Sequence, residues 1–105
     1  VTLALRAALG GQVDALRFLV EQCGPEVLTA AGADGLTPAH LAAMNGRVDA
    51  LRFLFEQCGR EVLTAANAGG WTPAHLAARD GHVDALGVLA ELCGSEVLTS
   101  GIPLL

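Results

Sequence analysis

The sequence of 105 residues contains no lysine, no tyrosine and only two serines, Ser95 and Ser100. A catalytic apparatus built on serine, lysine or tyrosine therefore has almost no residues to use. Six arginines against eleven acidic residues leave a net charge of −5. This charge argues against a nucleic-acid-binding surface, because affinity for phosphates depends on Lys and Arg. Pro, His and charged residues interrupt every apolar stretch before it reaches the roughly 18 residues of a membrane span, so we expect no membrane insertion.

Apolar residues are nevertheless abundant. They make up 52% of the chain, whereas aromatic residues make up 4%, so the apolar side chains are mainly Ala, Leu and Val, a composition that favours helices. The length is typical of one domain. The chain begins at Val1, without a Met or a charged signal segment, and this favours an excised or engineered segment.

The chain is an array of one 35-residue unit. Cys23, Cys58 and Cys93 lie 35 residues apart, and the frames 1–35, 36–70 and 71–105 place like residues on like. The first two frames are identical at 24 of 35 positions, and the second and third at 20. Chance cannot produce this agreement, so we predict a single repeat domain over residues 1–105, divided into these three repeats.

The first helix of each repeat is short. In the second frame, Thr37 is suited to cap a helix whose first residue is Pro38, because the hydroxyl accepts from a first-turn amide and proline has no amide to satisfy. The helix is predicted to continue over residues 39–44 and to stop at Asn45-Gly46, where glycine supplies a left-handed conformation.

A second helix is predicted from about residue 48 to residue 58. Its apolar stripe consists of Val48, Leu51, Leu54 and Phe55, the spacing of one helix face. Asp49 can pair with Arg52 three residues on. Residues 60–70 are predicted to form a loop that turns at Gly69-Gly70. Because neither helix can bury its stripe alone, neighbouring repeats must stack.

Residues 37–43 and 72–78 both read Thr-Pro-Ala-His-Leu-Ala-Ala. This heptad resembles the signature of ankyrin repeats, and the turns at 45–48 and 80–83 resemble the ankyrin inter-helix turn. The resemblance covers the whole chain and implies an all-α, ankyrin-like solenoid of three stacked helix-turn-helix repeats joined by hairpin-type loops.

Two features depart from the ankyrin pattern. The period of 35 exceeds the usual value of about 33, and the excess falls within residues 56–64. The first repeat lacks the heptad and has Arg6 where the second has Leu41. A polar residue there is what an N-terminal capping repeat needs.

The recurring His40 and His75 are not predicted as metal ligands, because a structural zinc site needs four clustered ligands and these histidines lie one per repeat. The resemblance implies instead that each imidazole binds backbone and threonine and holds the loop to the helix. His82 is expected to be a solvent-facing turn residue. We predict no metal site and no cofactor. We also predict no enzymatic activity, because no nucleophile, base and orienting group can be named together.

The three cysteines are predicted to be reduced thiols that act as small apolar residues under the ends of the second helices. Stacked helices lie about 8–10 Å apart, beyond the Cα separation of about 7 Å that a disulfide allows. Reduced thiols favour a cytoplasmic or nuclear location.

The resemblance implies a non-enzymatic protein–protein interaction module. In ankyrin-type proteins the loop tips and the inner face of the first helix form a concave recognition surface, and positions that differ between like repeats are candidates for partner contacts. Trp71 is the only tryptophan, and tryptophan is enriched at interface hot spots; covering the neighbouring Thr-Pro turn is an equally good interpretation. The differing positions are Asp34, Leu36, Met44, Asn45, Arg47, Trp71, Arg79, Asp80 and His82.

The alternative is an engineered or idealised ankyrin-repeat scaffold, or a fragment of a longer array, with no evolved ligand, because very regular repeats are the designable kind. The expected partner is another protein with a neutral or basic surface, since the chain is acidic. The apolar end, from Ile102 to Leu105, predicts weak self-association through the C-terminal end.

Overall fold

The computed structural model describes residues 2–32 and 34–99. Over these residues the chain forms eight α-helices and one 3-10 helix, and no strand. Each repeat contributes a first helix, a longer second helix and a short third one. The first helices are α1 (Leu3–Leu9), α3 (Pro38–Met44) and α6 (Pro73–Arg79). The second helices are α2 (Val13–Cys23), α4 (Val48–Cys58) and α7 (Val83–Cys93). The short ones are η1 (Pro25–Leu28), α5 (Glu61–Thr64) and α8 (Glu96–Thr99).

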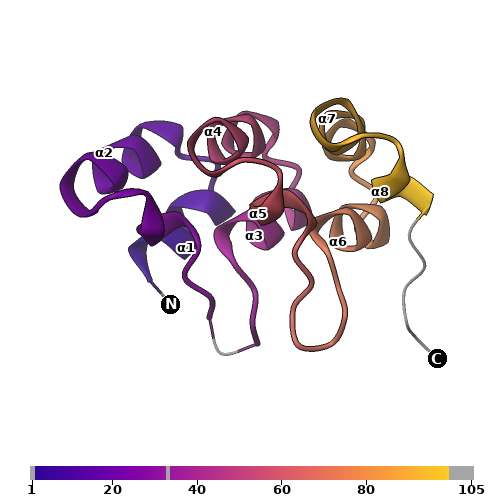
Figure 1. Ribbon diagram of the computed structural model, residues 1–105, viewed down its shortest axis with the longest axis horizontal. Coiled ribbons are helices and arrows are strands. Elements are labelled where there is room, and N and C mark those ends of the chain that lie inside the picture. Colours follow the sequence, from indigo (N-terminus) through magenta and orange to yellow (C-terminus); the bar gives the residue numbers. More distant parts are fainter. Residues whose placement is uncertain (1, 33, 100–105) are drawn as a thin grey trace.

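The helices form two layers. The first helices lie side by side in one layer and the second helices in the other, and the loops between repeats project from the first-helix layer (Figure 1). Each loop is closed by a hairpin-type backbone bond, from Gly32 N–H to the Leu36 carbonyl at 2.9 Å and from Asn67 N–H to the Trp71 carbonyl at 2.8 Å. The predicted all-α solenoid of stacked helix-turn-helix repeats is therefore confirmed.

The predicted first helix of the second repeat is confirmed at both ends. Thr37 caps α3 with its side chain, and the helix begins at Pro38. It ends at Met44, Asn45 is its C-cap, and Gly46 follows with φ of +69°. Glycine is the residue that adopts this conformation without steric cost, so the chain can turn sharply into α4.

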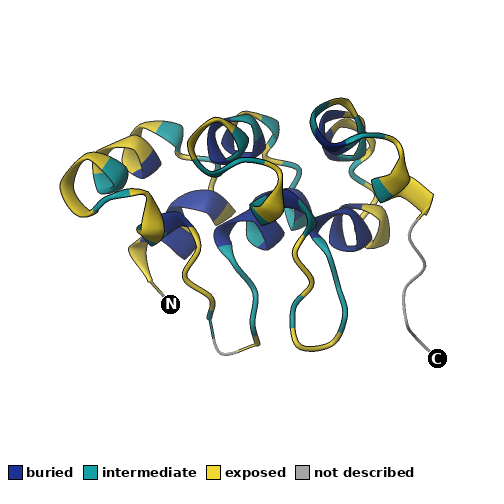
Figure 2. Cartoon of the chain, viewed as in Figure 1, coloured by how far each residue is buried: buried dark blue, intermediate teal, exposed yellow. Residues whose placement is uncertain are grey.

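The core lies between the two layers and between adjacent repeats (Figure 2). Leu16 of α2 and Leu51 of α4, which occupy equivalent positions, are fully buried, and so is Leu89 of α7. In the first-helix layer the buried residues are mainly alanines, such as Ala42 and Ala43. These small side chains allow neighbouring first helices to pack closely, so each repeat buries apolar surface that it could not bury alone.

The prediction that residues 60–70 form a loop is wrong for their first part. Glu61–Thr64 is a helical turn, α5. Gly59, with φ of +83°, reverses the chain after α4, and the turn then places Leu63 in the core at 1% exposure. The Thr64 hydroxyl closes the turn by donating to the Arg60 carbonyl at 3.2 Å. Burial of Leu63 thus gives this short, weakly helical segment its structure.

The buried face of α4 is wider than the predicted stripe. Leu51 and Leu54 are buried as expected, but Phe53 is buried too, whereas Val48 and Phe55 are only half-buried. The helix packs against α2 on one side and α7 on the other. A helix between two neighbours buries residues from both flanks, which a single-stripe argument does not include.

The cysteines are free thiols whose burial increases along the chain: Cys23 is exposed, Cys58 half-buried and Cys93 buried. The expectation that all three are tucked away is therefore wrong for Cys23. At Cys58 and Cys93 the preceding repeat supplies a polar contact. The Cys58 thiol reaches the Pro25 carbonyl at 3.9 Å, and Arg60 donates to the Cys93 carbonyl at 3.0 Å. Cys23 lies in the first of the three repeats, and no earlier repeat is among the described residues. Burial raises the pKa of the thiols of Cys58 and Cys93, so neither is activated as a thiolate.

Candidate partner-binding surface

His40 connects the second repeat to the third. The Thr37 amide donates to His40 Nδ1 at 3.1 Å, and the Thr37 hydroxyl lies 2.9 Å from the same atom. On the other side of the ring, Nε2 lies 2.8 Å from the carbonyl oxygen of Trp71. A carbonyl only accepts, so Nε2 carries the proton and Nδ1 is the acceptor. The histidine role implied by the family resemblance is present, and it also fixes the backbone at Trp71.

His40 is fully buried. Burial lowers its pKa, and the backbone carbonyl of Trp71 only partly opposes this effect. Both ring nitrogens are already used, and Nδ1 faces an N–H group, so a second proton would have to displace an existing hydrogen bond. The side chain is therefore a neutral structural link rather than an acid or a base.

Asn67 holds the loop that precedes the third repeat. Its side-chain oxygen accepts from the amides of Gly69 and Trp71, each at 2.9 Å, and its side-chain nitrogen donates to the Asp34 carbonyl of the preceding loop at 3.4 Å. The equivalent position in the first loop is Gly32, which has no such side chain. Our sequence reasoning missed Asn67, although the Gly-to-Asn difference and the asparagine's place in a turn were visible signals.

Trp71, Arg79 and Asp80 lie together on and beside α6. The Trp71 ring is half-buried and meets His75 edge to face, with ring centroids 6.1 Å apart and planes at 86°. The Arg79 guanidinium lies 5.8 Å from the centre of the Trp71 ring, and its Nε donates to Asp80 Oδ1 at 3.1 Å. The Trp71 ring before α6, the Arg79 guanidinium in the last turn of α6 and the Asp80 carboxylate after it therefore form one row of contacts. All three side chains are at least partly exposed to solvent.

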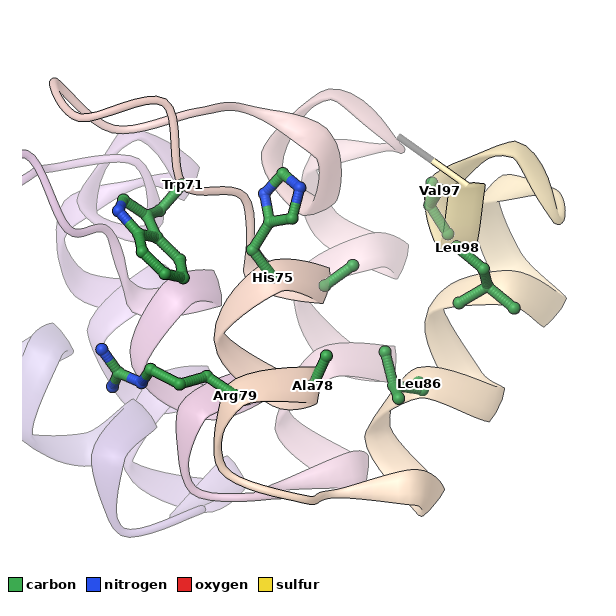
Figure 3. A pocket seen from close by; sticks show the side chains of 8 residues that line it. Trp71, His75, Ala78, Arg79, Leu86, Val97 and Leu98 are labelled. Carbon is green, nitrogen blue, oxygen red and sulfur yellow. The ribbon is translucent and has the colours of Figure 1, made fainter. Parts of the chain in front are cut away.

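A hollow of about 520 Å³ extends from this group across α6. Figure 3 shows Trp71 and Arg79 on one side of the helix and Leu86, Val97 and Leu98 on the other, with Ala78 between them. We call it the C-terminal hollow. Its lining is largely apolar, with one arginine and one histidine. Its residues are Trp71, Ala74, His75, Ala78, Arg79, Leu86, Val97 and Leu98.

Three other candidate residues lie at the inter-helix turns, where they contact the preceding repeat. Asn45 Nδ2 and Arg47 Nε both donate to the Leu9 carbonyl at the end of α1, each at 3.0 Å. His82 lies against Gly46: a Cβ built on that glycine would be 2.7 Å from His82 Nδ1. The expectation that His82 is simply solvent-facing is therefore wrong, because it is half-buried between two turns.

The remaining candidates are dispersed. Asp34 is exposed in the first loop and Leu36 is half-buried at the end of that loop. Met44 is half-buried in the last turn of α3. The structure therefore groups Trp71, Arg79 and Asp80, places Asn45, Arg47 and His82 at the turns, and leaves the other three apart.

In the described part of the chain, no three His, Cys, Asp or Glu side chains gather as a metal site would require. No helix among residues 2–32 and 34–99 combines the length and apolar character needed to cross a membrane. The surface around Trp71 presents an aromatic ring, the N–H donors of Arg79 and the carboxylate of Asp80. These groups can contact a bound partner.

The family model of ankyrin repeats matches the chain over residues 4–100, in three copies. The match covers nearly the whole sequence, so the chain belongs to the ankyrin-repeat family. Ankyrin repeats are generally protein–protein interaction modules and are typically non-enzymatic. A search of the curated proteins found no match to the chain.

Proposed function

We propose that residues 1–105 act as one non-enzymatic domain that binds another protein through its first helices and loop tips, with Trp71, Arg79 and Asp80 at the centre. The observation that supports this proposal best is the half-exposed Trp71 ring at the edge of an apolar hollow, within cation–π distance of Arg79. Large aromatic side chains and arginine are the residues that most often dominate binding energy at interfaces.

The backbone beneath the ring favours binding because it is already ordered. The Trp71 amide is held by Asn67 and its carbonyl by His40, so a partner need not pay the entropy of ordering this loop. Arg79 and Asp80 add a polar rim of the kind that surrounds the apolar centre of an interface. Within the chain the Trp71 ring meets His75 edge to face and makes one cation–π contact with Arg79.

The other six candidates, Asp34, Leu36, Met44, Asn45, Arg47 and His82, belong to the proposed surface as flanking contacts. The partner is proposed to be a protein with a neutral or basic surface, because the chain carries a net charge of −5 and complementary charge speeds and directs association. A cytoplasmic or nuclear location is part of the same proposal. So is weak self-association through the C-terminal end, although Ile102 to Leu105, on which that prediction was based, lie outside the described residues.

Affinity capture with the intact chain, followed by titration of each purified captured protein, tests this function. The bait is compared with Trp71→Ala, Arg79→Ala and the control Gln57→Ala, which changes an exposed residue of α4. We expect Trp71→Ala to raise the Kd at least about 30-fold, equivalent to about 2 kcal/mol for a hot spot. Gln57→Ala should leave the Kd unchanged.

If no captured protein distinguishes Trp71→Ala from wild type, the proposal is contradicted. Capture of no protein at all would favour the engineered or idealised scaffold with no evolved ligand. A large fall in melting temperature for Trp71→Ala would show instead that the ring serves mainly to cover the Thr-Pro turn.

A further inference from the structure

The C-terminal face of the third repeat leaves apolar surface uncovered over the described residues. Leu98 is 49% exposed, whereas its equivalents Leu28 and Leu63 are 0% and 1% exposed. In the second repeat, α5 packs against α6 and α7 of the repeat that follows. Leu98 lies on α8 at the same place in its own repeat, beside the C-terminal hollow (Figure 3). This face therefore has the composition of an inter-repeat interface.

The N-terminal face of the first repeat also leaves apolar side chains exposed, at positions that are buried against the preceding repeat in the second repeat. Phe18 is 58% exposed, whereas Phe53, its equivalent in the second repeat, is 3% exposed. Leu3 is 70% exposed, and its equivalent Pro38 is buried. Along the whole helix α2 only Leu16 is buried, while α4 buries four residues, as the colours of the two helices show (Figure 2). A hollow on this face is lined mainly by apolar residues, among them Leu3 and Phe18, and also by Arg6 and Gln12.

These two faces are the two halves of an interface that the chain already forms twice. Repeat 2 covers the C-terminal face of repeat 1, and repeat 3 covers that of repeat 2, with first helix against first helix and second helix against second helix at both interfaces. The repeats are close copies, with 24 and 20 of 35 positions identical between successive frames. The surface that would cover Leu98 in a fourth position is therefore present on every molecule, at the N-terminal face of its first repeat.

We propose that two copies of this chain associate head to tail, with α1 and α2 of one copy stacking on α6, α7 and α8 of the next. The proposal deepens the self-association stated above by naming the surface that meets the C-terminal end. Phe18 of one copy lies against α7 of the other, as Phe53 lies against α2 within the chain, and Leu3 reaches the C-terminal hollow. The contact is heterologous, since the two surfaces differ, and it can repeat along a row of molecules.

The junction is weaker than the internal interfaces because it lacks their polar links. Arg52 forms an ion pair with Glu91 at 3.1 Å across repeats 2 and 3, and Arg60 donates to the Cys93 carbonyl at 3.0 Å. At the junction Gly87 stands in the place of Arg52 and Ser95 in the place of Arg60. The junction therefore lacks these two arginine links and joins molecules of the same net charge. The association is therefore reversible, and added salt strengthens it by screening the repulsion.

The first test measures the mass of the intact chain by sedimentation equilibrium from about 10 µM to about 1 mM, the range of weak association. Phe18→Glu disables the N-terminal face and Leu98→Glu the C-terminal face; both change side chains that are already exposed, so the fold is retained, as circular dichroism checks. Gln57→Glu adds the same charge to an exposed site on the middle repeat. Wild type and Gln57→Glu should exceed the monomer mass of 10.7 kDa, and each face variant should raise the Kd at least about tenfold.

Mixing the two face variants is the sharper test. Phe18→Glu retains a good C-terminal face and Leu98→Glu a good N-terminal face, so an equimolar mixture should form a dimer of one of each and grow no further. Three results would overturn the proposal: a wild-type chain that stays monomeric to about 1 mM, a face variant that associates alone as strongly as wild type, or a mixture that stays monomeric. Association that appears only after deletion of residues 100–105 would also overturn it and would identify the chain's own tail as the occupant of the face. None of these results depends on Trp71→Ala, so partner binding is judged separately.

Discussion

Acidification below about pH 6.5 should destabilise the fold through His40. His40 is buried and neutral, and burial lowers its pKa below the ordinary value of 6.5. In the unfolded chain the same imidazole binds a proton as the pH falls through about 6.5. Between that pH and the lower folded pKa, the unfolded state holds one proton more than the folded state. The free energy of unfolding therefore decreases as the pH falls through this window.

The size of the effect has a physical limit. One additional proton in the unfolded state changes the free energy of unfolding by at most about 1.4 kcal/mol per pH unit. Well above pH 6.5 the histidine is neutral in both states and contributes no pH dependence. The free energy of unfolding stops decreasing once His40 is protonated in the folded state too. In that state the hydrogen bond from Nε2–H to the Trp71 carbonyl can persist, but Nδ1 can no longer accept from the Thr37 amide.

Urea denaturation followed by circular dichroism between pH 7.5 and pH 5 measures this slope. The comparison is with His40→Gln, which cannot titrate, and with the control Gln57→Ala, which changes an exposed residue of α4. The slope between pH 6.5 and pH 5 should fall for His40→Gln and stay close to wild type for Gln57→Ala. An equal slope in wild type and His40→Gln would refute the reasoning. Nitrogen NMR of the imidazole supplies a second measurement, in which Nε2 should carry the proton at neutral pH.

Two further predictions concern contacts between repeats. Gly46→Ala should lower the free energy of unfolding by more than Gly81→Ala. Both glycines have a positive φ, a conformation that costs a residue with a side chain about 1–2 kcal/mol. Only at Gly46 would the new Cβ also meet His82, at 2.7 Å, because a Cβ at Gly81 meets nothing within 4 Å. Equal losses in thermal or urea unfolding would show that the His82 contact is unimportant. Arg52→Ala should raise the pKa of Glu91 toward its ordinary value, because the hydrogen bond and the charge of Arg52 lower that pKa in the wild type. The same substitution should change the free energy of unfolding little, because both side chains are exposed. NMR titration of the Glu91 carboxyl measures the pKa. Glu91 contributes stability above its unfolded pKa and loses it as the pH falls through the folded one, in a more acidic window than His40.

Local features of the fold could be predicted from the sequence, and contacts across repeats could not. Thr37-Pro38 starts α3 and Gly46 follows its end, because capping and left-handed turns depend only on adjacent residues. Arg52 could equally have paired with Asp49, three residues away, but it pairs with Glu91 on another repeat. Nothing in the linear spacing distinguishes these partners, since the choice depends on how far one repeat is rotated relative to the next.

The side-chain contacts of the candidate site could not be predicted from the sequence either. Nine positions were predicted as partner contacts only because they differ between like repeats. Trp71 and Arg79 could be predicted to be varied and accessible, but the cation–π distance of 5.8 Å between them depends on the tertiary packing of α6. Asn67 escaped that reasoning because its role, holding the Trp71 amide, is performed by a side chain that points into its own loop.

Variation between the repeats therefore has two physical origins. Asn45 and Arg47 differ from their equivalents in the third repeat and both bind the Leu9 carbonyl, so their identities are suited to the junction with the first repeat. Trp71 and Arg79 vary too, but their contacts are mainly within the third repeat, and both side chains remain accessible. A repeat array must hold its register and can also present a ligand surface, and a given varied position can serve either need. Positions whose polar atoms are already used between repeats have little left to offer a partner, so the binding energy of the proposed surface should concentrate at Trp71 and Arg79.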